Sequence, residues 1–383
     1  MNRNERILIF SAYYPPHLGG VELYTLHLSE ALREMGFKTT VVTSGFANED
    51  QDLDESTDVI RVPSVSIVND RFPIILPGRK LKAVYNSLLR SNASHIVINT
   101  RYYSLTLMGL ALAKKLGIRP LIIDHSSGPI SSEASMLGTL LRLYENISNF
   151  LIRRYSPCMC SVSARGAAWS SSIGFNTLGV IHNSINADEF REAASLRDWR
   201  RELGCTSKTL LVAFAGRLIK EKGVLETIEA TEALKQRGLD IKLAIAGGGQ
   251  LESQISDMQS SSVRYVGALD RSDLSALLRD SNCFCLPTTY PEGLPTILLE
   301  AAAQENAIVV SDCAGAREVI PNESFGIVLD DTGSESVMEA LLRIYDDPTL
   351  SQQLGAAVRN HIDGNFTWDV AAQSLIAVLS KLQ

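Results

Sequence analysis

The stretch CFCLPTTYPEGLPTILLEAAAQ, residues 283–304, contains in one place the pattern that the rest of the chain repeats. Its apolar beginning predicts a buried strand and its end predicts a helix, with a loop of threonine, proline and glycine between them. Pro295 stands where the first residue of that helix is expected. Because a strand that leads through a loop into a helix is typical of parallel sheets, the stretch predicts an α/β fold.

The same alternation of short apolar runs and helix-compatible stretches continues along the chain. The runs that predict strands are RILIF (6–10), KTTVVTS (38–44), HIVINT (95–100), PLIIDHSSG (120–128), CMCSVS (158–163), LGVIHNS (178–184), TLLVAFAGR (209–217), IKLAIAGGG (241–249), VRYVGAL (263–269), SNCFCLPTTY (281–290), AIVVSD (307–312) and GIVLD (326–330). A chain of 383 residues is long for a single core, so two domains are expected. Since the sequence becomes charged and helical after Ala187, we predict two Rossmann-like domains, 1–186 and 187–365, whose parallel sheets face a central cleft.

The formal net charge of −7 is unevenly distributed along the chain. Residues 1–185 hold 18 Lys and Arg against 14 Asp and Glu, a net charge of +4. Residues 186–383 hold 18 against 29, a net charge of −11. The two halves are therefore expected to have separate tasks, and the basic half could meet an anionic surface.

Composition and termini favour a cytoplasmic globular protein. No apolar run approaches the roughly 20 residues that span a bilayer, and the one at the N-terminus is too short for a signal peptide. The cysteines form no CxxC pair and no metal-like cluster with histidine, which favours reduced, buried thiols. They are Cys158, Cys160, Cys205, Cys283, Cys285 and Cys313.

Ligands of open parallel sheets bind beyond the carboxyl ends of strands, so the loops at those ends are candidate sites. In SAYYPPHLGGVE (11–22), Gly19 and Gly20 allow the backbone to approach a phosphate or sugar oxygen before a helix begins, or they form only a tight turn. In FAGRLIKEKG (214–223), Arg217 and Lys222 leave one strand end. They could clamp a diphosphate, or lie solvated in a loop.

A third loop imitates a dinucleotide-binding fingerprint. Gly247 and Gly249 form a G-x-G after a strand, and Asp270 follows some 20 residues later. Glu252, however, occupies the position of the third glycine, and the loop does not belong to the first strand–helix unit of the chain. We therefore expect no binding of NAD.

The fourth loop is the one in the opening stretch, where Glu292 and Glu300 lie around a helix start. The helix dipole alone tolerates acids there. The helical period, however, places Glu300 away from the apolar face with which the helix packs. The backbone N–H groups of Gly293, Leu294 and Thr296 are expected to point outward. Two acceptors around a donor-rich helix end suit a polyhydroxylated ligand that carries an anion, because carboxylates accept from hydroxyls and amides donate to phosphate oxygens.

Taken together, these loops resemble glycosyltransferase family 4, whose members are retaining enzymes of the GT-B architecture. PEGLPTILLEA matches the E-x7-E motif of these nucleotide-sugar enzymes. The other matching stretches are YYPPHLGGVELYTLHLSEAL (13–32), VIHNSINADEF (180–190), AGRLIKEKG (215–223), GAREVI (315–320) and FTWDVAAQSL (366–375). The resemblance covers nearly all of the chain and implies that residues 366–383 form a terminal helix that crosses back to the first domain.

The resemblance also implies a role for each candidate residue. Arg217 and Lys222 would bind the donor diphosphate, Glu300 the nucleotide ribose and Glu292 the hydroxyls of the transferred sugar. Gly293, Leu294, Pro295 and Thr296 would line the sugar and phosphate site, and Gly19 and Gly20 would approach the donor. His125 would bind the sugar or the acceptor, with a satisfied polar residue as the alternative.

The chain departs from the family pattern at a few positions. Ser184 replaces the usual glycine of the interdomain segment, Asn186 the usual aspartate and His182 the usual proline. The frequent Gly-Gly turn is Ala314-Gly315 here. Because these positions mostly shape the linker and a turn, they affect hinge details more than activity.

No metal or cofactor is expected, because cations and helix-end amides can stabilise the departing diphosphate. Asp52 and Asp54 spell a DxD motif, but they lie in an acidic loop and not at a strand end. A nucleotide-sugar dehydrogenase or epimerase would need the failed fingerprint. A non-catalytic protein that binds sugar nucleotides remains an alternative, although Arg217, Lys222, Glu292 and Glu300 are all present.

Two stretches of the basic half suggest where the protein works. Residues 71–90 and 137–155 mix apolar residues with cations. In the second stretch Leu140, Leu143, Tyr144, Ile147, Phe150 and Leu151 fall at helical spacing, flanked by Arg142, Arg153 and Arg154. Such a stripe either packs on its own sheet or contacts an anionic membrane. We predict a peripheral enzyme that extends a glycan or lipid-linked acceptor in surface polysaccharide or glycolipid synthesis, with a small soluble acceptor as the alternative.

Overall fold

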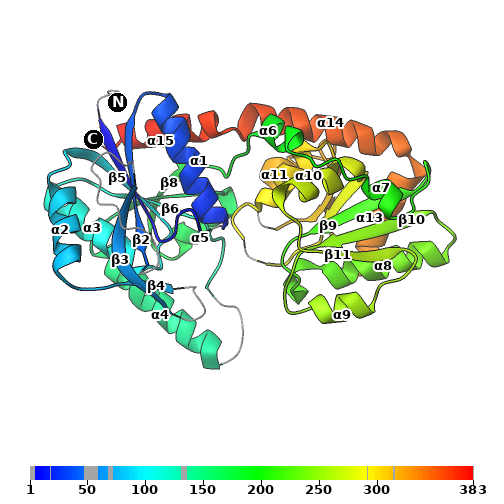
Figure 1. Cartoon of the computed structure of the whole chain (residues 1–383), viewed down its shortest axis with the longest axis horizontal. Coiled ribbons are helices and arrows are strands. Elements are labelled where there is room, and N and C mark those ends of the chain that lie inside the picture. Colours follow the sequence, from blue (N-terminus) through cyan, green and yellow to red (C-terminus); the bar gives the residue numbers. More distant parts are fainter. Residues whose placement is uncertain are drawn as a thin grey trace. The chain divides into compact units, whose positions relative to one another are not determined.

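The computed structural model describes residues 5–17, 19–46, 59–67, 72–130, 136–290, 292–313 and 315–382. The chain divides into two compact units (Figure 1). Unit 1 consists of Met1–Asn183 and Trp368–Gln383, and unit 2 consists of Ser184–Thr367. Within the described ranges, no helix has the length and hydropathy needed to cross a bilayer.

Unit 1 contains eight strands and six helices in its described part. The strands are β1 Arg6–Ser11, β2 Lys38–Gly45, β3 Val59–Ile67, β4 Phe72–Ile75, β5 Ala93–Asn99, β6 Leu121–Asp124, β7 Cys158–Ser161 and β8 Asn176–Val180. The helices are α1 Gly20–Glu34, α2 Arg79–Leu89, α3 Ser104–Leu116, α4 Met136–Arg153, α5 Ala164–Ser172 and α15 Trp368–Ser380.

The sheet of unit 1 has the order β4-β3-β2-β1-β5-β6-β7-β8 and is parallel except for the pair β3 and β4. Its central strands are buried on both faces, which explains why RILIF and LIID show no alternation of polar residues. One face carries a core that side chains of α2, α3 and α4 complete, among them Leu88, Met108 and Ile152. The strand order reverses between β1 and β5, so ligands are expected beyond the ends of these strands.

The last helix of the chain belongs to unit 1. α15 packs along α1, as the red and dark blue helices of Figure 1 show. The ring of Trp368, the first residue of α15, lies 5.6 Å from the ring of Tyr24 and 5.3 Å from that of His27, both on α1. The chain therefore leaves unit 1 after Asn183 and returns to it with Trp368.

α4 buries its polar side and exposes its apolar one. Glu145 and Asn149 are both buried, and each accepts a hydrogen bond from Nη1 of Arg101, at 3.1 and 3.0 Å. Arg101 is also buried, and its Nε donates to Asp124 at the end of β6 over 2.8 Å. The apolar stripe of Leu140, Leu143, Tyr144, Ile147, Phe150 and Leu151 is exposed. The interpretation in which this stripe packs on its own sheet is therefore wrong.

Unit 2 contains six strands and nine α-helices in its described part. The strands are β9 Leu210–Ala215, β10 Ile241–Ala246, β11 Val263–Gly267, β12 Cys283–Leu286, β13 Ala307–Ser311 and β14 Ile327–Leu329. The helices are α6 Ala187–Glu192, α7 Trp199–Glu202, α8 Val224–Gln236, α9 Glu252–Asp257, α10 Arg271–Asp280, α11 Thr296–Ala303, α12 Ala316–Val319, α13 Ser334–Asp346 and α14 Pro348–Asn365, with a short 3-10 helix η1 at Lys220–Lys222.

The sheet of unit 2 is entirely parallel, in the order β11-β10-β9-β12-β13-β14. Every residue of β9, β12 and β13 is buried, as the continuous apolar runs LLVAFA, CFCL and AIVVS require. The strand order reverses between β9 and β12. The loops that follow these two strands are therefore the expected ligand position of this unit, and they carry Arg217, Lys222 and Glu292.

Candidate active site

The three charged residues of the β9 and β12 loops form one cluster in unit 2. Nζ of Lys222 lies 2.7 Å from Oε2 of Glu292, and Nη2 of Arg217 lies 3.8 Å from Oε1 of the same carboxylate. The Lys222 side chain is only 5% exposed, whereas that of Arg217 is 56% exposed. One cation is thus fixed in place and the other reaches into solvent.

Tyr290 is a member of this cluster that the sequence did not single out. Its ring lies beneath both cations, with the centroid 4.8 Å from Cζ of Arg217 and 5.5 Å from Nζ of Lys222. The π face of an aromatic ring attracts cations at such distances, so Tyr290 orients them. In the sequence, its position two residues before Glu292 was the feature that could have indicated a role for Tyr290 in the site.

Hydrogen bonds join the loop that follows β9 to the loop that follows β12. The carbonyl of Glu221 in η1 accepts from the backbone N–H of Thr289 at 2.8 Å and from the hydroxyl of Thr288 at 3.0 Å. Gly223, at the end of η1, has φ +76° and lies so close to the other loop that a Cβ there would be 2.4 Å from the carbonyl oxygen of Pro287. The backbone itself therefore fixes the separation between the cations and Glu292.

The N-terminus of α11 follows this cluster directly. Pro295 is the N-cap of the helix, one residue before the position predicted for it, and Thr296 begins the helix. Gly293 and Leu294 are buried, and Thr296 is exposed. Because the first turn of a helix leaves backbone N–H groups without partners in the helix, a region rich in hydrogen-bond donors adjoins Glu292.

Glu300 lies on the second turn of α11 and is partly buried. Burial raises the pKa of its carboxyl group to about 7, although the positive charge of Arg271 opposes the shift. The carboxyl group therefore changes its charge near neutral pH. The ionised form of such a group accepts hydrogen bonds from a ligand more strongly than the protonated form does.

The G-x-G of residues 247–249 has a structural explanation. Gly247 has φ +133°, and a Cβ there would lie 1.9 Å from the carbonyl oxygen of Gly216. Gly249 has φ +155°, and a Cβ there would lie 2.6 Å from the carbonyl oxygen of Leu218. These glycines allow the β10 loop to pack against the loop that carries Arg217, which accounts for the motif without a dinucleotide.

In unit 1, Gly19 and Gly20 lie at the beginning of α1. Gly19 is the N-cap, and a Cβ there would lie 2.3 Å from Oε2 of Glu22. A side chain at Gly19 would therefore displace the carboxylate of Glu22 in the helix's own first turn. Gly20, in contrast, has open space where a Cβ would be, which leaves room for a ligand beside the backbone.

His125 follows β6 in unit 1. Its ring makes an edge contact with Tyr24 of α1, at 4.6 Å between centroids. Burial lowers the pKa of His125 to about 4, against the opposing charge of Asp124, so the ring is neutral at pH 7. Its Nε2 atom is buried and makes no hydrogen bond within the described residues. A buried polar atom without a partner is costly and is a position where a ligand group would be expected to bind.

Two predictions about metals and thiols concern the rest of the chain. In the part of the chain that the structure describes, no group of three or more His, Cys, Asp or Glu side chains is arranged to hold a metal ion. Asp52 and Asp54 lie outside the described residues. All six cysteines are free thiols, but Cys205 and Cys313 are only partly buried, so the prediction of burial is wrong for these two.

Two α/β units, with a cation–carboxylate cluster at the strand reversal of the second, agree with the GT-B architecture that the motifs imply. Residues 18–189 match the family model described as "Glycosyltransferase Family 4", and residues 196–361 match the one described as "Glycosyl transferases group 1". The chain belongs to glycosyltransferase family 4, as its motifs predicted. It is therefore a nucleotide-sugar-dependent enzyme whose family transfers sugars with retention of configuration.

Similar proteins cover nearly the full length of this chain. A glycogen synthase of Mycobacterium tuberculosis is 27% identical over 97% of this chain and 94% of its own. A GDP-mannose-dependent monoacylated alpha-(1-6)-phosphatidylinositol monomannoside mannosyltransferase of Corynebacterium glutamicum is 24% identical over 100% and 99%. The crystal structure of Anabaena HepE in complex with UDP shares the fold, with a TM-score of 0.74, 16% identity and coverage of 98% and 100%. The prediction of a GT-B fold is thus confirmed.

Proposed function

We propose that this enzyme transfers a sugar from a nucleotide-diphosphate donor to a glycan or lipid-linked acceptor in the synthesis of surface polysaccharide or glycolipid. The observation that carries the donor part is the cluster of Arg217, Lys222 and Glu292 at the strand reversal of unit 2. Cations and carboxylates so close together suit a ligand that has both phosphates and hydroxyls.

Arg217 and Lys222 would bind the donor diphosphate. When the bond between sugar and phosphate breaks, negative charge grows on the departing diphosphate, and preorganised cations lower the energy of that state. The Lys222 ammonium has three N–H donors, so its contact with Glu292 leaves donors for phosphate oxygens. Tyr290 beneath both cations restricts their movement before the donor arrives.

The carboxylates and the helix end would bind the remainder of the donor. In this proposal Glu292 accepts from hydroxyls of the transferred sugar, and Glu300 accepts from the ribose. The backbone N–H groups of Gly293, Leu294 and Thr296 would donate to sugar and phosphate oxygens at the beginning of α11. Donor binding by Glu300 then depends on its ionisation near neutral pH.

In unit 1, Gly20 and His125 would contact the sugar or the acceptor. The open space beside Gly20 admits a ligand. The buried Nε2 of His125 can exchange a hydrogen bond with a hydroxyl. Since His125 is neutral at pH 7, it would orient the sugar or acceptor and would not act as a strong acid there. We propose that catalysis needs no metal ion, because the cations of unit 2 neutralise the leaving group.

The donor base and sugar are best determined directly. The names of similar proteins include a complex with UDP and a dependence on GDP-mannose, so both bases belong in the test. The purified enzyme would be incubated with UDP-, GDP- and ADP-sugars, with and without EDTA, and release of the nucleoside diphosphate would be measured. We expect release from at least one donor, undiminished by EDTA. No release from any donor would argue for the non-catalytic alternative, and loss with EDTA that Mg²⁺ restores would contradict metal independence.

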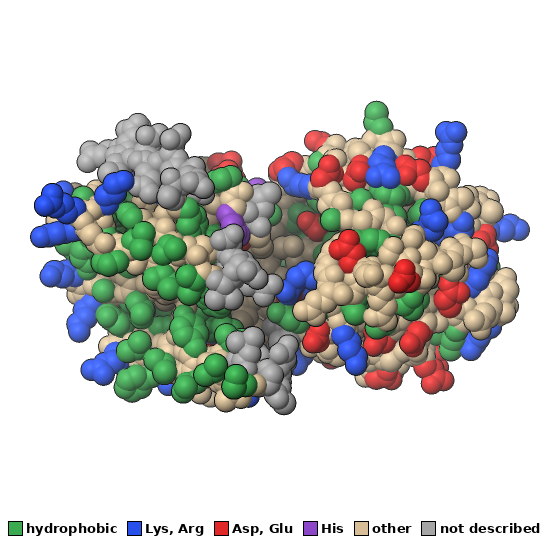
Figure 2. Space-filling model, turned by 60° about the horizontal axis from the view of Figure 1, so that its bottom comes forward, with side chains coloured by type: hydrophobic (Ala, Val, Ile, Leu, Met, Phe, Trp, Pro, Cys, Tyr) green, Lys and Arg blue, Asp and Glu red, His purple; other side chains and the backbone are tan. Residues whose placement is uncertain are grey.

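We further propose that the enzyme works as a peripheral protein on an anionic membrane at the cytoplasmic face. The apolar side chains of α4 are exposed, and Arg153 and Arg154 at its end are exposed as well. On the face of unit 1 that Figure 2 shows, hydrophobic side chains are gathered together, with lysines and arginines along one edge of the patch. An apolar helix face with flanking cations is typical of interfacial helices. Co-sedimentation with anionic vesicles at low salt is the expected result, and full activity on a soluble acceptor without vesicle binding would contradict it.

A further inference from the structure

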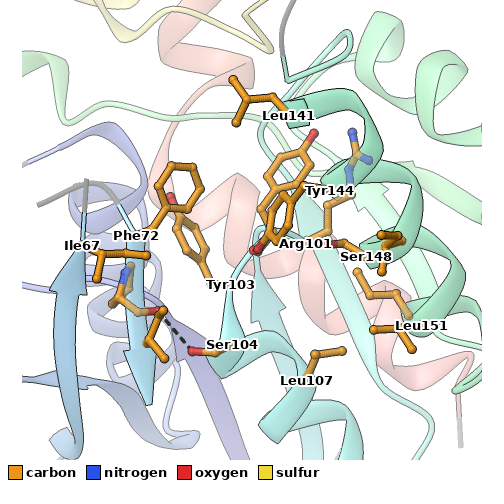
Figure 3. Close-up of a pocket in the computed structure, with 15 residues that line it drawn as sticks. Ile67, Phe72, Arg101, Tyr103, Ser104, Leu107, Leu141, Tyr144, Ser148 and Leu151 are labelled. Carbon is orange, nitrogen blue, oxygen red and sulfur yellow. Dashed lines mark hydrogen bonds between the residues drawn. The ribbon is translucent and has the colours of Figure 1, made fainter. Parts of the chain in front are cut away.

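Unit 1 contains an apolar cavity of about 470 Å³ between β4, α3 and α4 (Figure 3). Phe72 and Ile74 of β4 line one side, Leu107 of α3 the base, and Ile147 and Leu151 of α4 the other side. A cavity of this volume is in the range that holds a small organic ligand. Since Ile74, Ile147 and Leu151 are also exposed, the cavity is continuous with the apolar surface of unit 1.

Several polar groups of the cavity wall already have hydrogen-bond partners in the protein. The hydroxyl of Ser104 donates to the carbonyl of Pro73 at 3.1 Å and accepts from the N–H of Ile75 at 3.2 Å (Figure 3). The hydroxyl of Tyr144 donates to the carbonyl of Tyr102. Arg101, at the base of α4, is fully engaged by Asp124, Glu145 and Asn149. A sugar or nucleotide would find few free partners here, whereas a hydrocarbon chain needs none.

We propose that this cavity binds the hydrocarbon tail of a lipid-linked acceptor. The inference rests on the proposed transferase function and specifies the acceptor as a lipid that carries phosphate. Two observations favour a lipid: the cavity is continuous with the exposed face of α4, and exposed cations lie at the end of α4 and at the start of α2, the helix that follows β4. Arg153 and Arg154 lie at the end of α4, and Arg79, Lys80 and Lys82 lie in the first turn of α2, four residues after β4. The tail would enter the cavity while these cations face the phosphate of the headgroup.

The cavity also accounts for the orientation of α4, whose polar side faces the sheet and whose apolar side faces outward. The ion pairs of Arg101 with Asp124 and Glu145 attach the helix to the sheet through its polar side. Its apolar side then remains available to form one wall of the cavity and the surface around the opening. A helix attached through its apolar side would leave no such wall.

Photolabelling with alkyl phosphates of known chain length tests the proposal. The full-length enzyme would be irradiated with dodecyl phosphate that carries a diazirine near the end of its chain, and labelled peptides would be identified by mass spectrometry. We expect labels on residues 72–76, 102–107 and 141–152. Unlabelled alkyl phosphates should compete with an affinity that rises about fourfold for each added methylene group until the cavity is full.

Substitutions that fill the cavity provide the control. Ser148→Phe and Leu107→Trp add volume to its wall, and each should reduce labelling at least tenfold. Asn146→Phe adds the same ring at an exposed position of α4 outside the cavity and should leave labelling unchanged. Labels confined to outward residues such as Leu143 and Phe150, or insensitive to both cavity-filling variants, would show surface adsorption alone and overturn the proposal.

This measurement is independent of the donor chemistry. Labelling requires no nucleotide sugar, so its failure while the wild-type enzyme releases nucleoside diphosphate would reject the lipid cavity alone. Absence of release from every donor, with labelling intact, would reject the transferase function and leave a lipid-binding protein. Labelling that a purified protein partner abolishes, but long-chain alkyl phosphates do not, would identify the cavity as a protein interface and also overturn the inference.

Discussion

The two units differ most in what they expose to solvent. Fourteen large hydrophobic side chains are exposed among the described residues; thirteen of them belong to unit 1, and Leu196 alone belongs to unit 2. Residues 1–185 carry a net charge of +4, whereas residues 186–383 carry −11. A monomeric protein rarely leaves a large apolar patch exposed without a partner for it. The comparison therefore assigns an apolar, anionic partner to unit 1 and a hydroxyl-rich phosphate ligand to the cation cluster of unit 2.

The two units also differ in how many hydrogen-bond donors of their buried cations are used within the protein. Arg101 of unit 1 is 1% exposed and makes hydrogen bonds to Asp124, Glu145, Asn149 and Ser126, which consume its donors in holding α4. Among the residues that the structure describes, Lys222 of unit 2 forms an ion pair with Glu292 alone. The first arrangement stabilises the fold, and the second leaves capacity to bind a ligand. Substitutions can separate these two roles.

The largest effect is expected from Arg101→Met. The substitution leaves Asp124 and Glu145 buried without their cation, which should destabilise unit 1 by about 3–5 kcal/mol. Thermal and denaturant unfolding would measure the loss. Arg154→Met, at the exposed position that follows α4, is the matched control and should change stability little. Equal stability of both variants would show that the buried network does not hold α4.

Lys222→Met should affect catalysis more than folding. Removal of one charge-assisted contact to the diphosphate costs about 1.5–3 kcal/mol, which lowers kcat/KM for the donor roughly 10- to 150-fold. Lys220→Met changes the same charge at an exposed position of η1 and should retain wild-type kinetics. A folded Lys222→Met enzyme with unchanged kcat/KM would show that Lys222 does not bind the donor diphosphate.

Glu300→Gln should remove a pH dependence near neutrality. Because the carboxyl group has a pKa of about 7, its ionised fraction rises about tenfold from pH 6 to pH 8, and wild-type donor affinity should rise with it. Burial raises the folded pKa above the ordinary value of 4.5, so the wild-type protein also loses stability as pH rises from 4.5 through 7. The variant should show flat donor KM and less loss of stability. Parallel pH profiles for the two proteins would contradict the role of Glu300.

The smallest effect is expected from single cations beside the apolar surface. Arg154→Gln should weaken binding to anionic vesicles by about 1 kcal/mol, or roughly fivefold. Arg237→Gln removes an exposed cation of unit 2 and should leave vesicle binding unchanged. Co-sedimentation at several salt concentrations would measure both. An equal loss in both variants would mean that vesicle binding depends on net charge and not on the surface of unit 1.

The sequence was sufficient for the fold because its strands are continuous apolar runs. LLVAFA and CFCL are buried on both faces, and such runs are typical of parallel strands between helix layers. The family motifs then identified the loops that carry Arg217, Lys222 and Glu292. The spacing of residues 247 and 249 could not show that Gly216 and Leu218 lie against these glycines, because that contact joins separate loops.

The sequence was insufficient wherever a side chain's direction depends on distant residues. The helical period of α4 revealed an apolar stripe but not the side of the helix that faces the sheet. That side is decided by Arg101, which lies 44 residues from Glu145 in the sequence and binds it in the structure. Gly19 is a similar case, because the position of the Glu22 carboxylate beside it depends on the helix that follows. The role of Tyr290 also required the geometry of two loops.

Hydrogen–deuterium exchange with two ligands tests most directly the claim that the units bind different chemistry. The wild-type enzyme would be measured alone, with a nucleoside diphosphate that its active donor releases, and with anionic vesicles. The account predicts that the nucleotide protects residues 217–224 and 292–303, and that vesicles protect residues 72–76 and 136–153. Nucleotide protection confined to unit 1, or vesicle protection confined to unit 2, would contradict it.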